Sequence, residues 1–104
     1  MNAPTGPIYA PWPRKSDRVA VNADVIVRRP REHNFRVRIH NLSRHGCLVD
    51  FVSTPQLEDR LWVKFEGLEG LEAEVCWVRG YTAGVEFMKP LHPGVFDRLV
   101  AALS

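Results

Sequence analysis

Two short clusters of polar residues have the types and spacing to bind an anion or a nucleobase. Arg14 and Arg18 lie four residues apart in RKSDR, and NLSRHG, at residues 41–46, contains Asn41, Ser43 and Gly46. A guanidinium group is a planar, permanently charged donor that fits phosphate oxygens and the O6/N7 edge of guanine. Asn and Ser add short donors and acceptors, and Gly permits a backbone conformation closed to other residues. Taken singly, the clusters are also typical of a solvated domain edge and of a hairpin turn.

The elements around these clusters are predicted to be strands, because apolar and polar residues alternate with period two. Strand one is expected at residues 19–27, directly after Arg18, and strands two and three at residues 35–39 and 47–52, on either side of the second cluster. Further strands are expected at residues 61–65, 71–77 and 81–88, and the last two should pair as a hairpin. The apolar spacing after Pro93 and Gly94 predicts one short helix.

Six strands with short connections and one apolar face each are best buried by closing the sheet on itself, which also removes exposed edges. The sequence therefore predicts an all-β fold, a six-stranded antiparallel β-barrel with a short C-terminal α-helix. Residues 1–13 contain four prolines and one glycine, a composition that favours extended chain over a packed element. We expect a flexible N-terminal segment at residues 1–13 and a barrel domain at residues 14–104.

Composition places the chain among ordinary globular proteins, since 45% of its 104 residues are hydrophobic and 25% are charged. No stretch has the roughly 20 consecutive apolar residues of a membrane helix, and residues 1–13 lack the pattern of a secretory leader, so a cytoplasmic location is expected. Residues 1–50 carry nine Arg or Lys against four Asp or Glu, giving +5, whereas residues 51–104 carry five against eight, giving −3. The basic half is expected to face an anion.

Metal binding and catalysis find no support in the sequence. The cysteines and histidines are scattered without metal-ligand spacing, and no Ser, His and Asp grouping suits a nucleophile. These scattered residues are Cys47, Cys76, His33, His40, His45 and His92. We therefore expect no metal, no cofactor and no enzymatic activity, with both cysteines as buried thiols.

The two clusters in this order resemble the PilZ domain family. The family's motifs are R-x-x-x-R and [D/N]-x-S-x-x-G, and RKSDR and NLSRHG match them at every defined position. The stretches EVCWV at residues 74–78 and GVEF at residues 84–87 also look like the family's last two barrel strands. The resemblance covers residues 14–104 and implies a small bacterial β-barrel that binds cyclic di-GMP.

The resemblance also implies roles for individual residues. Arg14 and Arg18 would bind the phosphates and guanines of cyclic di-GMP, Asn41 a guanine edge, and Ser43 a phosphate or base, while Gly46 would allow close approach of the backbone. The basic N-terminal segment would then close on the ligand, and a stand-alone receptor of this kind would signal through a partner protein that the sequence does not identify.

Some features leave the binding mode open. Pro13 stands where some members of the family carry a further arginine, so the chain could hold one or two ligands. Arg44 and His45 are expected to face water, and Trp12 either caps the barrel or lies against a guanine. Trp77 is assigned to the barrel.

Two other functions remain as alternatives. One is a small basic barrel that binds single-stranded nucleic acid through a stripe of arginines, although the predicted second strand offers no aromatic stacking platform. That stripe comprises Arg28, Arg29, Arg31, Arg36 and Arg38. The other is a PilZ-like protein-interaction adaptor without ligand.

Overall fold

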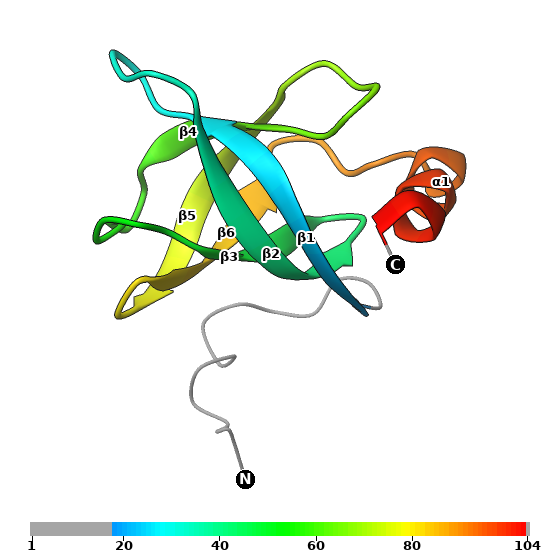
Figure 1. The fold of residues 1–104 in the computed structure, drawn as a ribbon, viewed down its shortest axis with the longest axis horizontal. Coiled ribbons are helices and arrows are strands. Elements are labelled where there is room, and N and C mark those ends of the chain that lie inside the picture. Colours follow the sequence, from blue (N-terminus) through cyan, green and yellow to red (C-terminus); the bar gives the residue numbers. More distant parts are fainter. Residues whose placement is uncertain (1–17, 104) are drawn as a thin grey trace, which may run out of the picture.

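The computed structural model describes residues 18–103, which form six strands and one helix (Figure 1). Arg14 and the expected N-terminal segment, residues 1–13, lie outside the described residues. The elements are β1 (Val19–Arg28), β2 (Phe35–Ser43), β3 (Gly46–Asp50), β4 (Arg60–Lys64), β5 (Leu71–Arg79), β6 (Thr82–Phe87) and α1 (Pro93–Leu103).

The six strands close into an antiparallel barrel in the order β1-β2-β3-β6-β5-β4, which confirms the predicted fold. The hairpin predicted between the last two strands is present, and Gly80 gives its two-residue turn the positive φ that such turns need. The barrel closes where β1 meets β4 over three residue pairs, from Ile26 opposite Lys64 to Arg28 opposite Trp62. α1 lies beside the barrel and contacts β1 (Figure 1).

The core fills the inside of the barrel with the apolar residues of each alternating strand. Val27, Ile39, Leu61 and Val85 have no exposed side-chain surface. From α1, Leu99 adds a buried side chain, so the helix covers one side of the barrel. The predicted alternation is confirmed because each strand has one face in this core and one face outside.

The second strand is longer than predicted, and its turn is shorter. Asn41 pairs with Leu48 and Ser43 pairs with Gly46, so both motif residues belong to the β2–β3 ladder. Only two residues, at positions 44–45, remain as the turn. Polar side chains suggested a six-residue turn, but backbone pairing, which does not depend on side-chain polarity, continues through them.

A β-bulge in β5 changes the side of the sheet on which Trp77 lies. The register of β5 against β6 shifts between Val75 and Trp77, and after the shift Val78, opposite Ala83, packs against the core. Trp77 is only 5% exposed, but it lies outside the core cluster, with its indole over Gly84. Trp77 is buried on the barrel, as predicted. The expectation that inward and outward residues alternate without interruption through Trp77 was wrong, because the extra residue of the bulge reverses the two faces of the strand.

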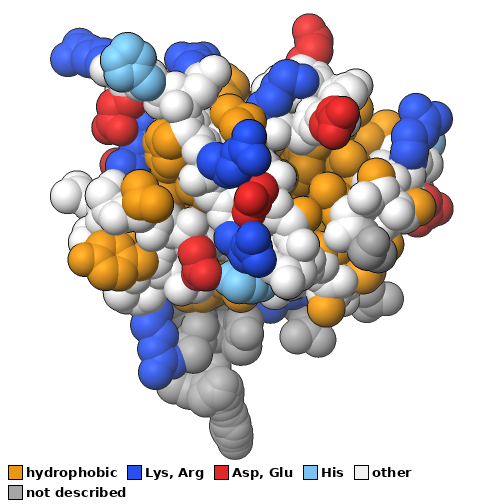
Figure 2. Space-filling view, viewed as in Figure 1, with side chains coloured by type: hydrophobic (Ala, Val, Ile, Leu, Met, Phe, Trp, Pro, Cys, Tyr) orange, Lys and Arg blue, Asp and Glu red, His pale blue; other side chains and the backbone are white. Residues whose placement is uncertain are grey.

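The outer surface differs from region to region. Basic, acidic and histidine side chains lie over β1 and β2, and hydrophobic side chains gather toward α1 (Figure 2). Within residues 18–103, no helix is long and apolar enough to cross a membrane.

Candidate functional site

The motif residues that the structure describes meet at one end of the barrel. Arg18 directly precedes Val19, which pairs with Leu42, so Arg18 enters beside the Ser43 end of β2. Ser43 in turn pairs with Gly46 at the start of β3. Residues from both clusters, 23 or more positions apart in the chain, are therefore neighbours, while Arg14 lies outside the described part of the chain.

Asn41 carries a polar atom whose position suggests a ligand. Its side-chain oxygen Oδ1 is buried and has no hydrogen-bond partner among the described residues. A buried acceptor without a partner costs about 1–3 kcal/mol, so such atoms are uncommon unless something binds them. An acceptor at this place suits a donor such as the N1–H or N2–H group of guanine.

The turn between β2 and β3 is held rigidly. The hydroxyl oxygen of Ser43, a 4% exposed residue, accepts a hydrogen bond from the His45 N–H at 3.1 Å and donates a long one to the Gly46 carbonyl at 3.5 Å. The carbonyls of Arg44 and His45 accept from the N–H groups of Leu91 and Phe87 at 2.7 and 2.8 Å. The turn therefore does not need a ligand to take its shape.

Arg44 has a structural role in this turn. Its Nε donates to the Leu91 carbonyl at 2.8 Å, which fastens the segment before α1 to the β2–β3 turn. The expectation that Arg44 faces water is wrong, because its guanidinium satisfies a backbone carbonyl that no ladder uses.

Gly46 has a packing role that the sequence did not predict. Its φ is not among the positive values of the described residues, so the expected special backbone conformation is absent. Instead, a Cβ at this position would lie 2.1 Å from the Val85 carbonyl oxygen of β6. Gly46 is needed because the backbone of a neighbouring strand occupies the place of a side chain.

A row of residues crosses the outer face beside Asn41. Asn41 pairs with Leu48, Leu48 with Gly84, and Gly84 with Trp77, so the row spans β2, β3, β6 and β5. The indole fills the space that Gly84 leaves, since a Cβ there would lie 2.1 Å from Trp77 Nε1. These four residues form a face with the Asn41 side chain at one end, Leu48 and Gly84 in the middle and the Trp77 indole at the other end. We refer to it as the Asn41–Trp77 face.

The charge of Arg18 reaches this face. Burial and the neighbouring Glu86 carboxylate raise the pKa of the Cys76 thiol to about 11, and the Arg18 guanidinium acts in the opposite direction. The Cys76 thiol lies 3.3 Å from the carbonyl oxygen of Gly84, so the group on which the Arg18 charge acts is beside the Asn41–Trp77 face. Such a charge favours an anionic ligand.

Comparison with known proteins identifies the family. The family model for the PilZ domain matches residues 13–104. The chain belongs to the PilZ family. Among solved structures it is similar to the crystal structure of the PilZ domain of CeSA from a cellulose-synthesizing bacterium, with a TM-score of 0.59 and 13% identity over 85% of this chain and 95% of that one. The comparison with curated proteins gave no match.

The PilZ family is a family of cyclic di-GMP receptors. Within residues 18–103, no group of three His, Cys, Asp or Glu side chains is placed to hold a metal ion. The two cysteines are unpaired thiols. Cys47 is buried, and burial raises its pKa to about 12, whereas the expectation that Cys76 is also buried was wrong, because its side chain is only half-buried.

The arginines that suggested nucleic-acid binding do not form one continuous stripe on the PilZ barrel. The Arg38 Nε lies 3.2 Å from an oxygen of Asp24, and the side chain of Arg29 is 13% exposed and packs over Phe35 and Phe51. The stripe therefore does not present a continuous row of available cations.

Trp77, Leu48 and Gly84 were not predicted as site residues. A signal for Trp77 exists at residues 75–78, where four apolar residues follow one another without a polar one, a pattern that a β-bulge explains. That Leu48 and Gly84 pair with the site residues follows only from the strand order, which the sequence did not supply.

Proposed function

We propose that this protein is a cyclic di-GMP receptor that binds its ligand on the Asn41–Trp77 face. The observation that carries the proposal is the buried Asn41 Oδ1, which lacks a partner among the described residues and lies on the face that the Arg18 charge reaches. Cyclic di-GMP has two phosphates and two guanines, so it offers both the negative charge and the N–H donors that this face suits.

Each motif residue has a role in this proposal. The Arg18 fork binds a phosphate or the O6/N7 edge of one guanine, and Arg14 does the same from the N-terminal segment. Asn41 accepts a hydrogen bond from a guanine edge. Ser43 can exchange its long 3.5 Å bond to the Gly46 carbonyl for a bond to the ligand, because little energy is lost with so poor a bond.

The consequence of binding would be a conformational change that a partner protein recognises. The β2–β3 turn is fixed in advance by its bonds to residues 87 and 91. The residues before Val19 would therefore do the moving, and they would fold over the ligand through Arg14 and Arg18. The product of binding is a new surface for a partner, and no reaction is required.

Titration calorimetry with cyclic di-GMP tests the proposal. Arg18→Ala and Arg14→Ala should each weaken binding by about ten- to a hundredfold, since a hydrogen bond to a charged group contributes about 1.5–3 kcal/mol. Arg98→Ala, which removes an exposed guanidinium of α1, is the matched control and should bind like the parent.

Two results would contradict the proposal. One is a parent protein that gives no heat with cyclic di-GMP. The other is an Arg18→Ala variant that binds as tightly as the parent, because the guanidinium would then lie outside the site. The same titration reports stoichiometry and so distinguishes one ligand from two.

A further inference from the structure

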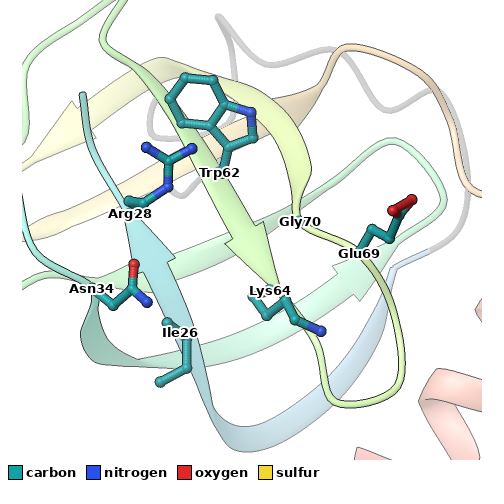
Figure 3. A pocket seen from close by; sticks show the side chains of 7 residues that line it. All are labelled: Ile26, Arg28, Asn34, Trp62, Lys64, Glu69 and Gly70. Atoms are coloured by element: carbon teal, nitrogen blue, oxygen red, sulfur yellow. The ribbon is translucent and has the colours of Figure 1, made fainter. Parts of the chain in front are cut away.

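The outer side of the closure between β1 and β4 holds a hollow that the proposed ligand site does not use. Its volume is about 650 Å³, and Ile26, Arg28, Trp62, Lys64 and Glu69 are among the residues that line it. The Arg28 and Trp62 side chains lie together at one side of it, and Glu69 stands apart on the loop after β4 (Figure 3).

The strand register surrounds an apolar centre with three cations. Ile26 pairs with Arg36 on one side and Lys64 on the other, and the neighbouring row pairs Arg28 with Trp62. Side chains directly opposite on one face of a sheet lie about 5 Å apart at Cβ. We refer to Ile26, Arg28, Arg36, Trp62 and Lys64 as the β1–β4 basic patch.

The arginines of this patch differ from Arg38 and Arg60, which also lie on the barrel wall. Elsewhere Arg38 pairs with Asp24 at 3.2 Å, and Arg60 pairs with Glu72 at 2.6 Å. Within residues 18–103, neither Arg28 nor Arg36 forms an ion pair with a carboxylate.

Lys64 also forms no ion pair with a carboxylate among the described residues. Its ammonium donates to the backbone carbonyls of Phe65 and Leu68, which are neutral. The patch therefore carries three positive charges, with Glu69 at the rim of the hollow and Glu72, which is opposite Trp62 and forms an ion pair with Arg60, beside it. Such an excess attracts an anionic partner.

We propose that the β1–β4 basic patch binds an acidic segment of a partner protein, with one apolar side chain of that segment over Ile26. The three cations face the carboxylates, and the hollow beside Trp62 admits the apolar side chain. Single-stranded nucleic acid fits less well, because it needs several exposed aromatic faces. The patch has one indole, and the Arg28 guanidinium carbon lies 4.3 Å from its ring centre.

This inference rests on the part of the proposed function that assigns the output to a partner, and it names the surface for that partner. β1 connects the two sites, since its first residue follows Arg18 and its last residue is Arg28. The patch and the Asn41–Trp77 face share only β2, where Arg36 and Asn41 are five positions apart, so an acidic segment and cyclic di-GMP can be bound at the same time.

Fluorescence anisotropy with labelled ten-residue peptides tests the inference on the full chain. One peptide has acidic residues around a central leucine, a second has Gln in place of the acids, and a third has Ser in place of the leucine. The first should bind best, and added salt should weaken it because exposed charges are screened beyond about 8 Å at physiological ionic strength. Arg28→Glu with Arg36→Glu should lower its affinity at least about tenfold.

A matched double variant controls for net charge. Arg79→Glu with Arg98→Glu makes the same charge change at two exposed arginines away from the patch and should bind the acidic peptide like the parent. Equal binding by both double variants would overturn the inference. So would the absence of saturable binding up to roughly 1 mM peptide, or equal binding of all three peptides.

Two further measurements separate the alternatives. An oligothymidine that binds the patch more tightly than the acidic peptide would overturn the inference in favour of nucleic acid. Cyclic di-GMP titration of the Arg28→Glu, Arg36→Glu variant should match the parent. If the parent itself does not bind cyclic di-GMP, the proposed ligand function fails, while the peptide results still decide whether the patch binds acidic segments.

Discussion

The two outer faces of the barrel each carry a tryptophan, but they hold it in different ways. Trp77 is 5% exposed and fills the space over Gly84, to which a bulge in β5 directs it. Trp62 is half-buried, and the charged end of Arg28 lies over its ring. Close packing holds the Trp77 indole, whereas the long, charged side chain of Arg28 covers the Trp62 indole.

This difference indicates what each face can recognise. The Asn41–Trp77 face has small residues, a buried acceptor and little freedom, so it suits one ligand of defined shape. The β1–β4 basic patch depends on long side chains and charge, so it suits a class of acidic segments more than a single structure.

The largest predicted effect distinguishes the two tryptophans by stability. Trp77→Ala should lower the free energy of unfolding by about 3 kcal/mol, because it empties a packed space. Trp62→Ala should cost about 1 kcal/mol or less, since a half-exposed cation–π pair contributes little. Urea unfolding of both variants measures the contrast, and equal losses would show that the two faces are packed alike.

A double-mutant cycle sharpens the same point. Gly84→Ala in the parent places a Cβ 2.1 Å from Trp77 Nε1 and should destabilise the fold. In the Trp77→Ala background this clash is gone, so the two losses should not add. Strict additivity would mean that the indole does not occupy the space over Gly84.

The next effect compares a glycine from each face. Gly46→Ala should lower the free energy of unfolding by about 2 kcal/mol, because the Val85 carbonyl is backbone and cannot move aside. Gly70→Ala is the control, since its Cβ would meet Trp62 at an ordinary 3.6 Å. The denaturant midpoints of the two variants measure this difference in stability. A Gly46→Ala variant as stable as the parent would show that β6 does not approach Gly46 closely.

A third prediction separates binding from stability at Asn41. Asn41→Ala should weaken cyclic di-GMP binding about tenfold, the effect of losing one good hydrogen bond. The free energy of unfolding should not fall, because Oδ1 makes no hydrogen bond with the described residues and its removal relieves the cost of a buried, unpaired acceptor. A variant that unfolds easily yet binds normally would make Asn41 structural.

The smallest effect concerns Asp50, which lies outside both faces. Partial burial acts to raise its pKa, but hydrogen bonds from His40 and Thr82 and the charges of His40 and Arg38 together lower it below the ordinary value. A lowered pKa of Asp50 stabilises the fold at pH values above about 3.9, the pKa of this group in the unfolded chain. This contribution is lost as the pH falls through the pKa of the folded state.

Asp50→Asn should therefore reduce stability at pH 7 by less than about 1 kcal/mol, because the paired His40 and Asp50 side chains are 40% and 45% exposed and water screens them. The difference from the parent should shrink toward zero in acid. Thermal unfolding at several pH values measures it, with the exposed Asp97→Asn as control. A difference that grows in acid would contradict the lowered pKa.

Much of the fold followed from local pattern. Alternation located six strands because a half-buried strand must alternate, and one apolar face per strand required closure of the sheet. Strand ends were less predictable, as at Asn41 and Ser43, because ladder pairing depends on the partner strand and not on side-chain polarity.

For the candidate site, the sequence by itself supplied the motif residues Arg18, Asn41, Ser43 and Gly46 and the chemistry of their side chains. The tertiary structure decided what surrounds them. That Gly46 faces the Val85 carbonyl and that Trp77 lies outside the barrel depend on strand order and on a one-residue bulge. Period-two patterns cannot show these features, because contacts between distant strands are set only when the barrel closes.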